Sequence, residues 1–244
     1  MVLTATSISG YTLRVADDGA QVAAAQRLRH RVFAEELGAT LHSPVPGLDV
    51  DEFDAYCDHL IVSDDASGDV VGTYRLLPPG RLPRRYADGE FDLTALDPLR
   101  DILAETGRSC VHPDHRSGAV INLIWAGIAR YLHLNGHRWL GGCASVPLDD
   151  GGATAAGVWD LVRRKHLSPP VLRVRPHRPW PVDAVAPPPR TVVPPLLRGY
   201  LRLGAWVCGE PAYDPDFGCA DLYVLLSLDR VDPRYLRHFL GEVP

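Results

Sequence analysis

The sequence lacks a strong excess of basic charge. Its 25 lysine and arginine residues face 30 acidic residues, which leaves a formal net charge of -5, and Lys165 is the only lysine. A nucleic-acid-binding protein would carry a marked basic excess, so the charge balance argues against that class. Apolar residues make up 46% of the chain and charged residues 23%, which is typical of a globular protein with a hydrophobic core.

Long hydrophobic runs and paired cysteine motifs are lacking too. No segment approaches the roughly 20 apolar residues of a transmembrane helix, and residues 1–10 show neither the basic nor the apolar region of a signal peptide. We therefore expect a cytoplasmic protein, and weak attachment to the inner face of a membrane stays open. The five cysteines are odd in number and none has C-x-x-C spacing. This predicts reduced, buried thiols, with neither disulfides nor a metal site.

The motifs of several hydrolase classes are also absent. Ser145 follows Cys143 on a predicted strand, but no G-x-S-x-G elbow surrounds it, which argues against a serine hydrolase. His112 and His115 have no H-E-x-x-H partner, which argues against a zinc protease. Cys110 lies close to His112 and would be a candidate nucleophile, but a thiol in the core is the preferred interpretation.

Hydrophobic periodicity predicts a chain of the α/β class. The expected strands cover residues 11–15, 59–62, 70–77, 105–111, 139–146, 200–207 and 222–228. The expected helices cover residues 20–37, 121–135, 153–166 and 234–240. Because helices and strands alternate only in the middle of the chain, we expect a mixed sheet with helices on both faces. A Pro-rich connection, residues 168–195, is expected to be an insertion within a single domain that spans residues 1–244.

The strongest local candidate for a site is the predicted strand, loop and helix at residues 105–132. The first N–H groups of a helix and its dipole together attract anions. The residues expected to present such groups are Arg116, Ser117, Gly118 and Ala119. Gly118 would let the backbone come close to a phosphate. An ordinary strand-to-helix connection has the same spacing, so both interpretations stay open.

Acids and arginines on predicted strands and in one loop form a second candidate. The turn signal at residues 64–69 predicts that the strands at 59–62 and 70–77 form a β-hairpin. Asp51 and Asp54 precede this hairpin, and Arg75 lies near the end of its second strand. A buried charge needs a partner, so these three residues either pair as scaffolding or line a site. Glu105 and Arg108 lie three apart on the central strand, so their side chains should start on opposite faces. Glu105 is a candidate general base, or it orients Arg108.

Four segments in the first half of the chain resemble the signature of autoinducer synthases, which are GNAT-fold enzymes that take acyl chains from acyl carrier protein. These segments are residues 28–33 (LRHRVF), the acids at 49, 51 and 54, residues 72–78 (GTYRLLP), and Glu105-x-x-Arg108. Ala39 stands where these enzymes carry Trp and Asp49 where they carry Glu, which argues against use of S-adenosylmethionine. The second half resembles the ornithine N-acyltransferases of ornithine-lipid synthesis, through residues 108–111, 123–132, 142–145, 194–205 and 214–221.

This resemblance implies a GNAT fold and a specific reaction. A 3-hydroxyacyl or other fatty acyl group would move from acyl carrier protein, or from acyl-CoA, to the α-amine of ornithine or a similar amino acid. The product would be a lyso-ornithine-lipid. The phosphopantetheine thioester would be a co-substrate, and no tightly bound cofactor is expected.

The resemblance also implies roles for individual residues. The catalytic residues would be Glu105 and Arg108. Donor binding would involve Cys110, Val111, Arg116, Ser117, Gly118 and Ala119. Acceptor binding would involve Arg29, Phe33, Asp51, Asp54, Arg75 and Ser145. Three arginines would meet an acidic carrier protein: Arg29, Arg31 and Arg116.

Three other functions remain compatible with the sequence. One is an N-acyl amino acid synthase with a different acceptor. Another is a non-catalytic module that binds an acyl carrier or a lipid on a GNAT scaffold, because fold does not dictate function. The third is a short-chain acetyltransferase that uses acetyl-CoA. Release of free thiol from acyl carrier protein on addition of amino acids would distinguish an enzyme from a binding module.

Overall fold

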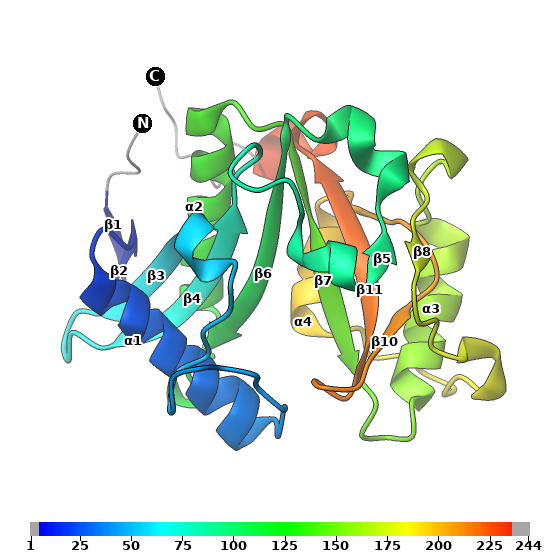
Figure 1. Cartoon of the computed structure of the whole chain (residues 1–244), viewed down its shortest axis with the longest axis horizontal. Helices are drawn as coiled ribbons and strands as arrows, with labels where there is room; N and C mark the ends of the chain where they lie inside the picture. The colour runs from blue at the N-terminus through cyan, green and yellow to red at the C-terminus, as the bar shows by residue number, and fades with distance from the viewer. Residues whose placement is uncertain (1–4, 236–244) are drawn as a thin grey trace. The chain divides into compact units, whose positions relative to one another are not determined.

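A computed structural model describes residues 5–235 of the 244-residue chain. The described chain falls into two compact units (Figure 1). Unit 1 comprises residues 5–81, 106–137 and 233–235, and unit 2 comprises residues 82–105 and 138–232. Strand β6 (Leu103–Val111) begins in unit 2 and ends in unit 1. A single domain spanning residues 1–244 stays a prediction.

Unit 1 is built on antiparallel strands, in an order that keeps neighbours in sequence adjacent in space. These strands are β1 (Thr6–Ile8), β2 (Tyr11–Val15), β3 (Asp58–Asp64) and β4 (Val70–Leu77), and β6 follows next to β4. The turn at residues 65–69 joins β3 to β4 and is rich in Asp, Ser and Gly, which favour tight turns. The predicted hairpin is therefore confirmed.

Two helices cover opposite faces of the unit 1 sheet, α1 (Gly19–His30) in front and α2 (Ala119–Asn135) behind in Figure 1. Asp18 caps α1, because its carboxylate accepts the Gln21 N–H at 2.8 Å. Gly72 of β4 allows α2 to approach closely, since a Cβ at this position would lie 2.5 Å from Val120. Helix α2 therefore covers the face of β4 on which Gly72 makes room, and α1 covers the opposite face.

Unit 2 combines parallel and antiparallel pairing. Its two longest strands, β7 (Trp139–Pro147) and β11 (Cys219–Ser227), are antiparallel along their whole length. Residues 103–105 of β6 run parallel to β7. The remaining elements are β5 (Phe91–Asp92), α3 (Ala153–Lys165), β8 (Arg175–Pro176), α4 (Pro195–Arg202), β9 (Trp206–Val207) and β10 (Ala212–Asp214). The predicted α/β class with a mixed sheet is confirmed.

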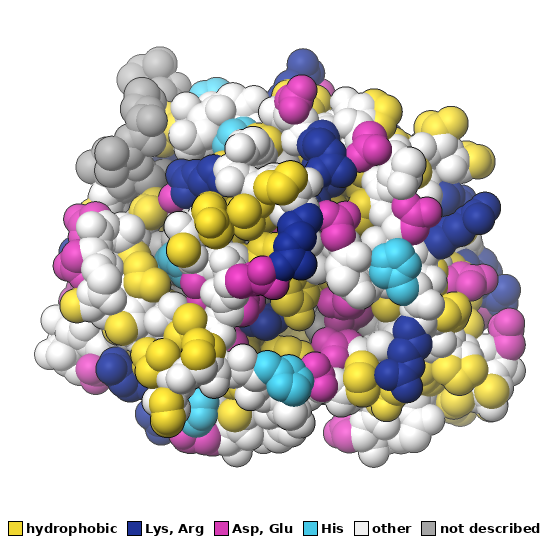
Figure 2. All heavy atoms as spheres, in the orientation of Figure 1, with side chains coloured by type: hydrophobic (Ala, Val, Ile, Leu, Met, Phe, Trp, Pro, Cys, Tyr) yellow, Lys and Arg dark blue, Asp and Glu magenta, His cyan; other side chains and the backbone are white. Residues whose placement is uncertain are grey.

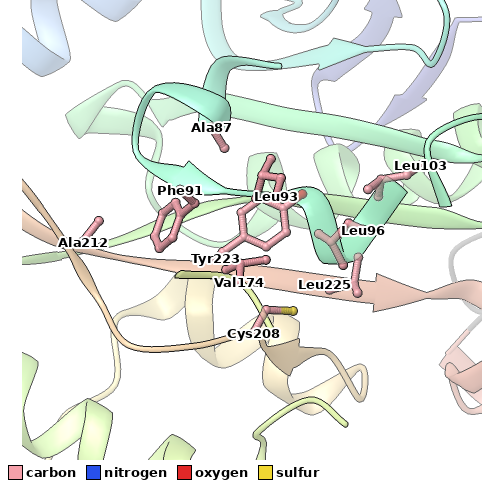
Figure 3. Packing of buried hydrophobic residues seen from close by; sticks show 10 residues of the cluster. All are labelled: Ala87, Phe91, Leu93, Leu96, Leu103, Val174, Cys208, Ala212, Tyr223 and Leu225. Atoms are coloured by element: carbon pink, nitrogen blue, oxygen red, sulfur yellow. The ribbon is translucent and has the colours of Figure 1, made fainter. Parts of the chain in front are cut away.

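A hydrophobic core packs against β11 in unit 2 (Figure 3). Tyr223 lies within it, fully buried, with its ring edge-on to Phe91 at a centroid distance of 5.9 Å. Gly141 of β7 makes room for Tyr223, because a Cβ at this position would lie 2.5 Å from the tyrosine hydroxyl and 3.2 Å from Leu103. The glycine is therefore needed for this packing.

The prediction of a strand over residues 200–207 is wrong. Helix α4 occupies Pro195–Arg202, and only Trp206–Val207 pairs as a strand. Proline is favoured in the first turn of a helix, where its missing N–H costs nothing. Leu197 and Tyr200, three apart, are the buried residues of this helix, and Gly204 follows with φ +88°. A helical period was therefore present, although the apolar run resembled a strand.

Three other expectations need adjustment. The first helix is α-helical only to His30 and continues as a π-helical segment, Arg31–Glu36, which ends before Gly38 at φ +73°. Residues 233–235 are helical, and the rest of the closing helix predicted over 234–240 lies outside the described residues. The Pro-rich stretch packs into unit 2, because Val174 and Trp180 are buried and Arg175–Pro176 pairs with β5.

Candidate active site

Six charged side chains of unit 1 form a closed ring of alternating sign, which we call the charged ring: Arg29, Asp54, Arg75, Asp51, Arg108 and Asp49. Asp54 lies between two arginines, 2.6 Å from Arg29 Nη2 and 2.8 Å from Arg75 Nη1. Asp51 joins Arg75 to Arg108, at 2.6 and 3.4 Å. The ring therefore connects α1, the loop before β3, β4 and β6.

Asp49 closes the ring, because its Oδ2 lies 2.8 Å from Arg29 Nε and 3.1 Å from Arg108 Nε. Burial differs around the ring. The Arg29 side chain is completely buried, whereas the side chains of Asp51 and Arg108 are 21% and 12% exposed. Of the six side chains in the ring, those of Asp51 and Arg108 alone are therefore more than a tenth exposed to solvent.

The ring shifts the pKa values of its members. Burial acts to raise the pKa of Asp54, but the hydrogen bonds and charges of Arg29 and Arg75 outweigh burial and hold this pKa well below its ordinary value. Burial likewise acts to lower the pKa of Arg75, and the carboxylates of Asp51 and Asp54 outweigh it. Both residues thus stay charged at neutral pH. The interpretation of Asp54 and Arg75 as scaffolding fits this geometry.

The prediction that Arg29 contacts a carrier protein is wrong, because its side chain is fully buried and bonded to Asp49 and Asp54. Arg31 and Arg116 are exposed and stay candidates. On the face shown in Figure 2, basic side chains are interspersed with acidic and hydrophobic ones in both units. Phe33 is buried in unit 1, beside Val32 in the π-helical segment.

Strand β6 is irregular where it leaves unit 2. Arg108 has φ +51°, a left-handed conformation that non-glycine residues rarely adopt. The strict alternation of side chains therefore fails at this residue, so the expectation that Glu105 and Arg108 start on opposite faces does not follow from their spacing. Instead, the turn at Arg108 brings its guanidinium to Asp49 and Asp51. Such strain often accompanies function.

The loop after β6 leads into α2 through a glycine with a left-handed backbone, and its role as an anion site stays a prediction. Gly118, at φ +99°, precedes α2, and no side chain among the described residues caps this helix start. Arg116 is held in place by Glu36, with two hydrogen bonds of 2.6 and 2.8 Å, and by the Val111 carbonyl at 3.0 Å. The bond to Arg116 lowers the pKa of Glu36. Ser117 is exposed beside these groups, and Ala119 begins the helix.

Cys110 lies in the core of unit 1, and burial raises the pKa of its thiol to about 12. At neutral pH the thiol is therefore protonated, which is the unreactive form. The interpretation as a core thiol is supported. The cysteines among the described residues are free, as predicted, although Cys57 and Cys143 are only partly buried.

Glu105 holds a neighbouring turn in unit 2. Its Oε2 accepts the Tyr86 N–H at 2.7 Å and its Oε1 accepts the Ala87 N–H at 3.0 Å. These bonds satisfy the start of a short 3₁₀ helix, Tyr86–Gly89. Only 5% of Glu105 is exposed to solvent. The carboxylate is thus fixed in one orientation.

Unit 2 also contains a pair of acids at Glu90 and Asp221. The pKa of Asp221 is raised by burial, in spite of its hydrogen bond with Ser145. Burial and then the nearby Asp221 raise the pKa of Glu90. Cys143 lies close enough to both acids for the three to hold a metal ion geometrically, but burial raises the pKa of this thiol, and a metal would require the thiolate. Ser145, which was predicted to bind the acceptor, lies opposite Asp221 in the pairing of β7 with β11.

Sequence reasoning missed two buried polar residues of unit 2, Arg85 and Tyr223. Arg85 is 5% exposed, and neither Nη1 nor Nη2 has a hydrogen-bond partner among the described residues. The Tyr223 hydroxyl has none there either. Arg85 follows Arg84 in a segment without periodicity, so nothing in the pattern separated the buried arginine from its exposed neighbour.

The predicted site residues thus form two groups. Unit 1 brings together Arg29, Asp51, Asp54, Arg75 and Arg108, and carries Phe33, Cys110, Val111 and residues 116–119. Unit 2 carries Glu105 and Ser145. No helix of residues 5–235 is both long enough and apolar enough to cross a membrane.

Comparison with known proteins identifies the family of this chain. The acetyltransferase (GNAT) domain family matches residues 28–126. An L-ornithine N(alpha)-acyltransferase of Rhodobacter capsulatus is 36% identical over 96% of this chain and 96% of its own length. The enzyme of the same name from Brucella abortus is 34% identical over 96% of this chain and 90% of its own length.

Solved structures share the fold. A CoA-dependent acyl-homoserine lactone synthase, solved with SAM and isopentyl-CoA, matches with a TM-score of 0.55 and 19% identity over 93% of this chain and 85% of its own. An N-acyl amino acid synthase from uncultured soil microbes matches with a TM-score of 0.52 and 12% identity over 90% of this chain and 92% of its own. The sequence identity to the curated relatives, over almost their full length, goes further than the fold: this chain is an N-acyltransferase with a GNAT fold and belongs to the L-ornithine N(alpha)-acyltransferase family.

Proposed function

We propose that this enzyme transfers a fatty acyl group, 3-hydroxylated in its preferred form, from acyl carrier protein to the α-amine of ornithine. The product is a lyso-ornithine-lipid. The observation that carries the proposal is identity of 34 and 36% to two L-ornithine N(alpha)-acyltransferases along almost the entire chain. Acyl-CoA is the alternative donor, and attachment to the inner face of the membrane would bring the product to its destination.

The end of β6 and the start of α2 would bind the donor. The His112 N–H donates to the Val71 carbonyl of β4 at 2.8 Å. Because N–H groups alternate in direction along a strand, we expect the Val111 N–H to point away from β4, where a ligand could accept from it. It would donate to the thioester oxygen and stabilise the oxyanion of the tetrahedral intermediate. The N–H groups after Gly118 would bind the pantetheine phosphate.

Glu105 would accept the proton of the attacking amine, through a water molecule. Its oxygens accept the Tyr86 and Ala87 N–H groups, which fix the direction in which the carboxylate points. No covalent enzyme intermediate is required, because the amine attacks the thioester directly and the thiol of the carrier leaves with a proton.

The decisive experiment mixes the purified enzyme with 3-hydroxyacyl carrier protein and a pool of amino acids, and identifies new N-acyl products by mass spectrometry. An N-acyl-ornithine product, formed faster from the carrier protein than from the matching acyl-CoA, is expected. A different acylated amino acid would replace ornithine as the acceptor. Equal rates from both donors would argue against a requirement for the carrier protein.

Glu105→Gln tests the base. Glutamine keeps one acceptor oxygen for the turn at residues 86–89 but takes no proton. We expect turnover to fall by about 100-fold or more, the typical contribution of a general base, and stability to fall by about 1–3 kcal/mol, because the amide NH2 then faces one of the two backbone N–H groups. Unchanged turnover would show that Glu105 only supports the turn.

A further inference from the structure

Arg85 is a buried cation whose ends lack partners. The residue is 5% exposed, and its Nη1 and Nη2 atoms have no hydrogen-bond partner in the described chain. The other arginines buried to this degree among residues 5–235, Arg29 and Arg75, each bind carboxylates of the charged ring. Since an unpaired buried charge is strongly unfavourable, a fold keeps one only where a ligand or a function compensates.

Two further groups belong to the surroundings of Arg85. One is the Tyr223 hydroxyl, which also has no hydrogen-bond partner among the described residues, and the other is Glu105, the proposed base. The neighbouring Tyr86 N–H binds Glu105 Oε2 at 2.7 Å. Glu105 faces Gly141 in the β6–β7 pairing, and a Cβ at Gly141 would lie 2.5 Å from the Tyr223 hydroxyl. Ala87, two residues after Arg85, packs in the same core cluster as Tyr223 (Figure 3).

Electrostatics agree with this proximity. Burial raises the pKa of Tyr223 well above its ordinary value, the Glu105 charge adds to this, and the positive charge of Arg85 opposes it. The charges of Glu105 and Arg85 therefore both act on the Tyr223 hydroxyl within unit 2. The Tyr223 hydroxyl, like the Arg85 nitrogens, has no hydrogen-bond partner among residues 5–235.

The unmatched groups fit one chemical class of ligand. A guanidinium offers its N–H groups as a planar fork that matches the two oxygens of a carboxylate, and a phenol adds one more donor. Glu105 nearby is an acceptor for an amine. An α-amino acid carries a carboxylate and an amine on the same carbon atom. Its carboxylate can accept from Arg85 and Tyr223 while its amine donates to Glu105.

We propose that Arg85, assisted by the Tyr223 hydroxyl, binds the α-carboxylate of the acceptor amino acid and so places its α-amine at Glu105. The proposal rests on the function proposed above. It makes Arg85 a specificity-determining residue, because an amine without the carboxylate would leave the guanidinium unpaired. A shift of the 82–90 segment on binding would admit the ligand to these buried nitrogens.

The test compares ornithine with putrescine, which is ornithine without its carboxylate, as acceptors for wild type, Arg85→Gln, Tyr223→Phe and Arg84→Gln. Arg84 is the exposed neighbour of Arg85 and provides the matched control for loss of one positive charge. For Arg85→Gln we expect kcat/KM for ornithine to fall by about 10- to 100-fold, the value of a charge-assisted pair, mainly through KM. The rate with putrescine should stay unchanged, so that the preference for ornithine is lost. Tyr223→Phe should act in the same direction with a smaller effect.

Stability provides a second readout that a structural role would not give. Arg85→Gln removes an unpaired charge, so its melting temperature without ligand should equal or exceed that of wild type. Ornithine should raise the melting temperature of wild type and of Arg84→Gln but not of Arg85→Gln. An Arg85→Gln protein that melts lower and loses both acceptors equally would assign Arg85 to the scaffold and overturn the proposal. A raised KM for the acyl donor alone would point to the pantetheine phosphate and overturn it as well.

Failure of the proposed function gives a different result. If wild type acylates another α-amino acid, ornithine is the wrong acceptor, and the same comparison with that amino acid and its decarboxylated amine tests Arg85. If no α-amino acid in the pool is acylated or raises the melting temperature of wild type, the carboxylate site itself is refuted.

Discussion

The charged ring predicts that Asp54 and Asp51 differ sharply when each is replaced by Asn. Asp54 accepts from Arg29 at 2.6 and 3.0 Å, from Arg75 at 2.8 Å and from Gln26 at 3.0 Å, and its side chain is 5% exposed. Removing one charge from such a buried network leaves its partners uncompensated and costs about 3–5 kcal/mol. Asp54→Asn should therefore lower the melting temperature by about 6–20 °C for a chain of this size.

Replacing Asp51 by Asn should reduce stability less than replacing Asp54. It meets Arg75 at 2.6 Å and Arg108 at 3.4 Å, and its side chain is 21% exposed, so water can replace part of what is lost. We expect about 1–2 kcal/mol for Asp51→Asn. The control is Asp97→Asn, which breaks an ion pair with Arg100 in which both side chains are 40% or more exposed and which should cost less than about 0.5 kcal/mol.

The effect of Asp54 should also depend on pH. Its pKa is held below the ordinary value, so the folded state binds its proton less readily than the unfolded state does. The stability it provides is complete above its unfolded pKa of about 3.9 and declines as the pH falls further. The difference between wild type and Asp54→Asn should therefore be largest at pH 7 and shrink toward pH 3.

Urea unfolding followed by circular dichroism at pH 7, 5 and 3 would measure these differences. The reasoning fails if Asp54→Asn unfolds within about 1 kcal/mol of wild type, or if Asp51→Asn costs more than Asp54→Asn. Either result would mean that the buried pairs between Asp54 and its two arginines do not hold unit 1 together.

Three further predictions follow from single contacts. Glu90→Gln should gain stability relative to wild type as the pH rises from 5 to 9, by up to about 1.4 kcal/mol per pH unit, because the raised pKa keeps Glu90 protonated in the folded state while the unfolded state releases this proton; a pH-independent difference in urea unfolding would refute this. Gly141→Ala should cost about 1–3 kcal/mol through the clash with Tyr223, whereas Gly107→Ala, where a Cβ would meet nothing within 4 Å, should be nearly neutral; equal melting temperatures for the two variants would contradict it. Glu36→Gln should free Arg116 and raise KM for acyl carrier protein with little change in stability, and an unchanged KM would exclude Arg116 from the donor surface.

The sequence predicted the elements whose periodicity was regular. The hairpin of β3 and β4, the helices α2 and α3, and the strands β7 and β11 lie where hydrophobic spacing placed them. Helix α4 was missed because its eight residues are too few for a helical period to outweigh an apolar run. The short strands β1, β5 and β10 were missed because two or three residues carry no period at all.

The charged ring was only half predictable. One interpretation of the sequence was that Asp51 and Asp54, which share a loop, pair with Arg75 on a strand, and the structure shows both pairs. Closure of the ring through Arg108 depends on a left-handed backbone at that residue, φ +51°, which its sequence neighbours do not specify. The complete burial of Arg29 could not be predicted either. An arginine in a helix can point to solvent or toward buried carboxylates, and its position in the sequence does not distinguish the two.

Arg29 and Arg85 show how two buried arginines can have opposite roles in the same chain. Arg29 binds Asp49 and Asp54, so its replacement by Gln strands two buried carboxylates and should cost about 3–5 kcal/mol. Arg85 has no partner at either terminal nitrogen in the described chain, so its replacement strands nothing and removes an unfavourable charge. Melting temperatures of Arg29→Gln and Arg85→Gln, measured without ligand, should therefore move in opposite directions or differ by several degrees. If both fall together, burial alone decides the effect of an arginine in this fold, and the assignment of Arg85 to substrate recognition fails with it.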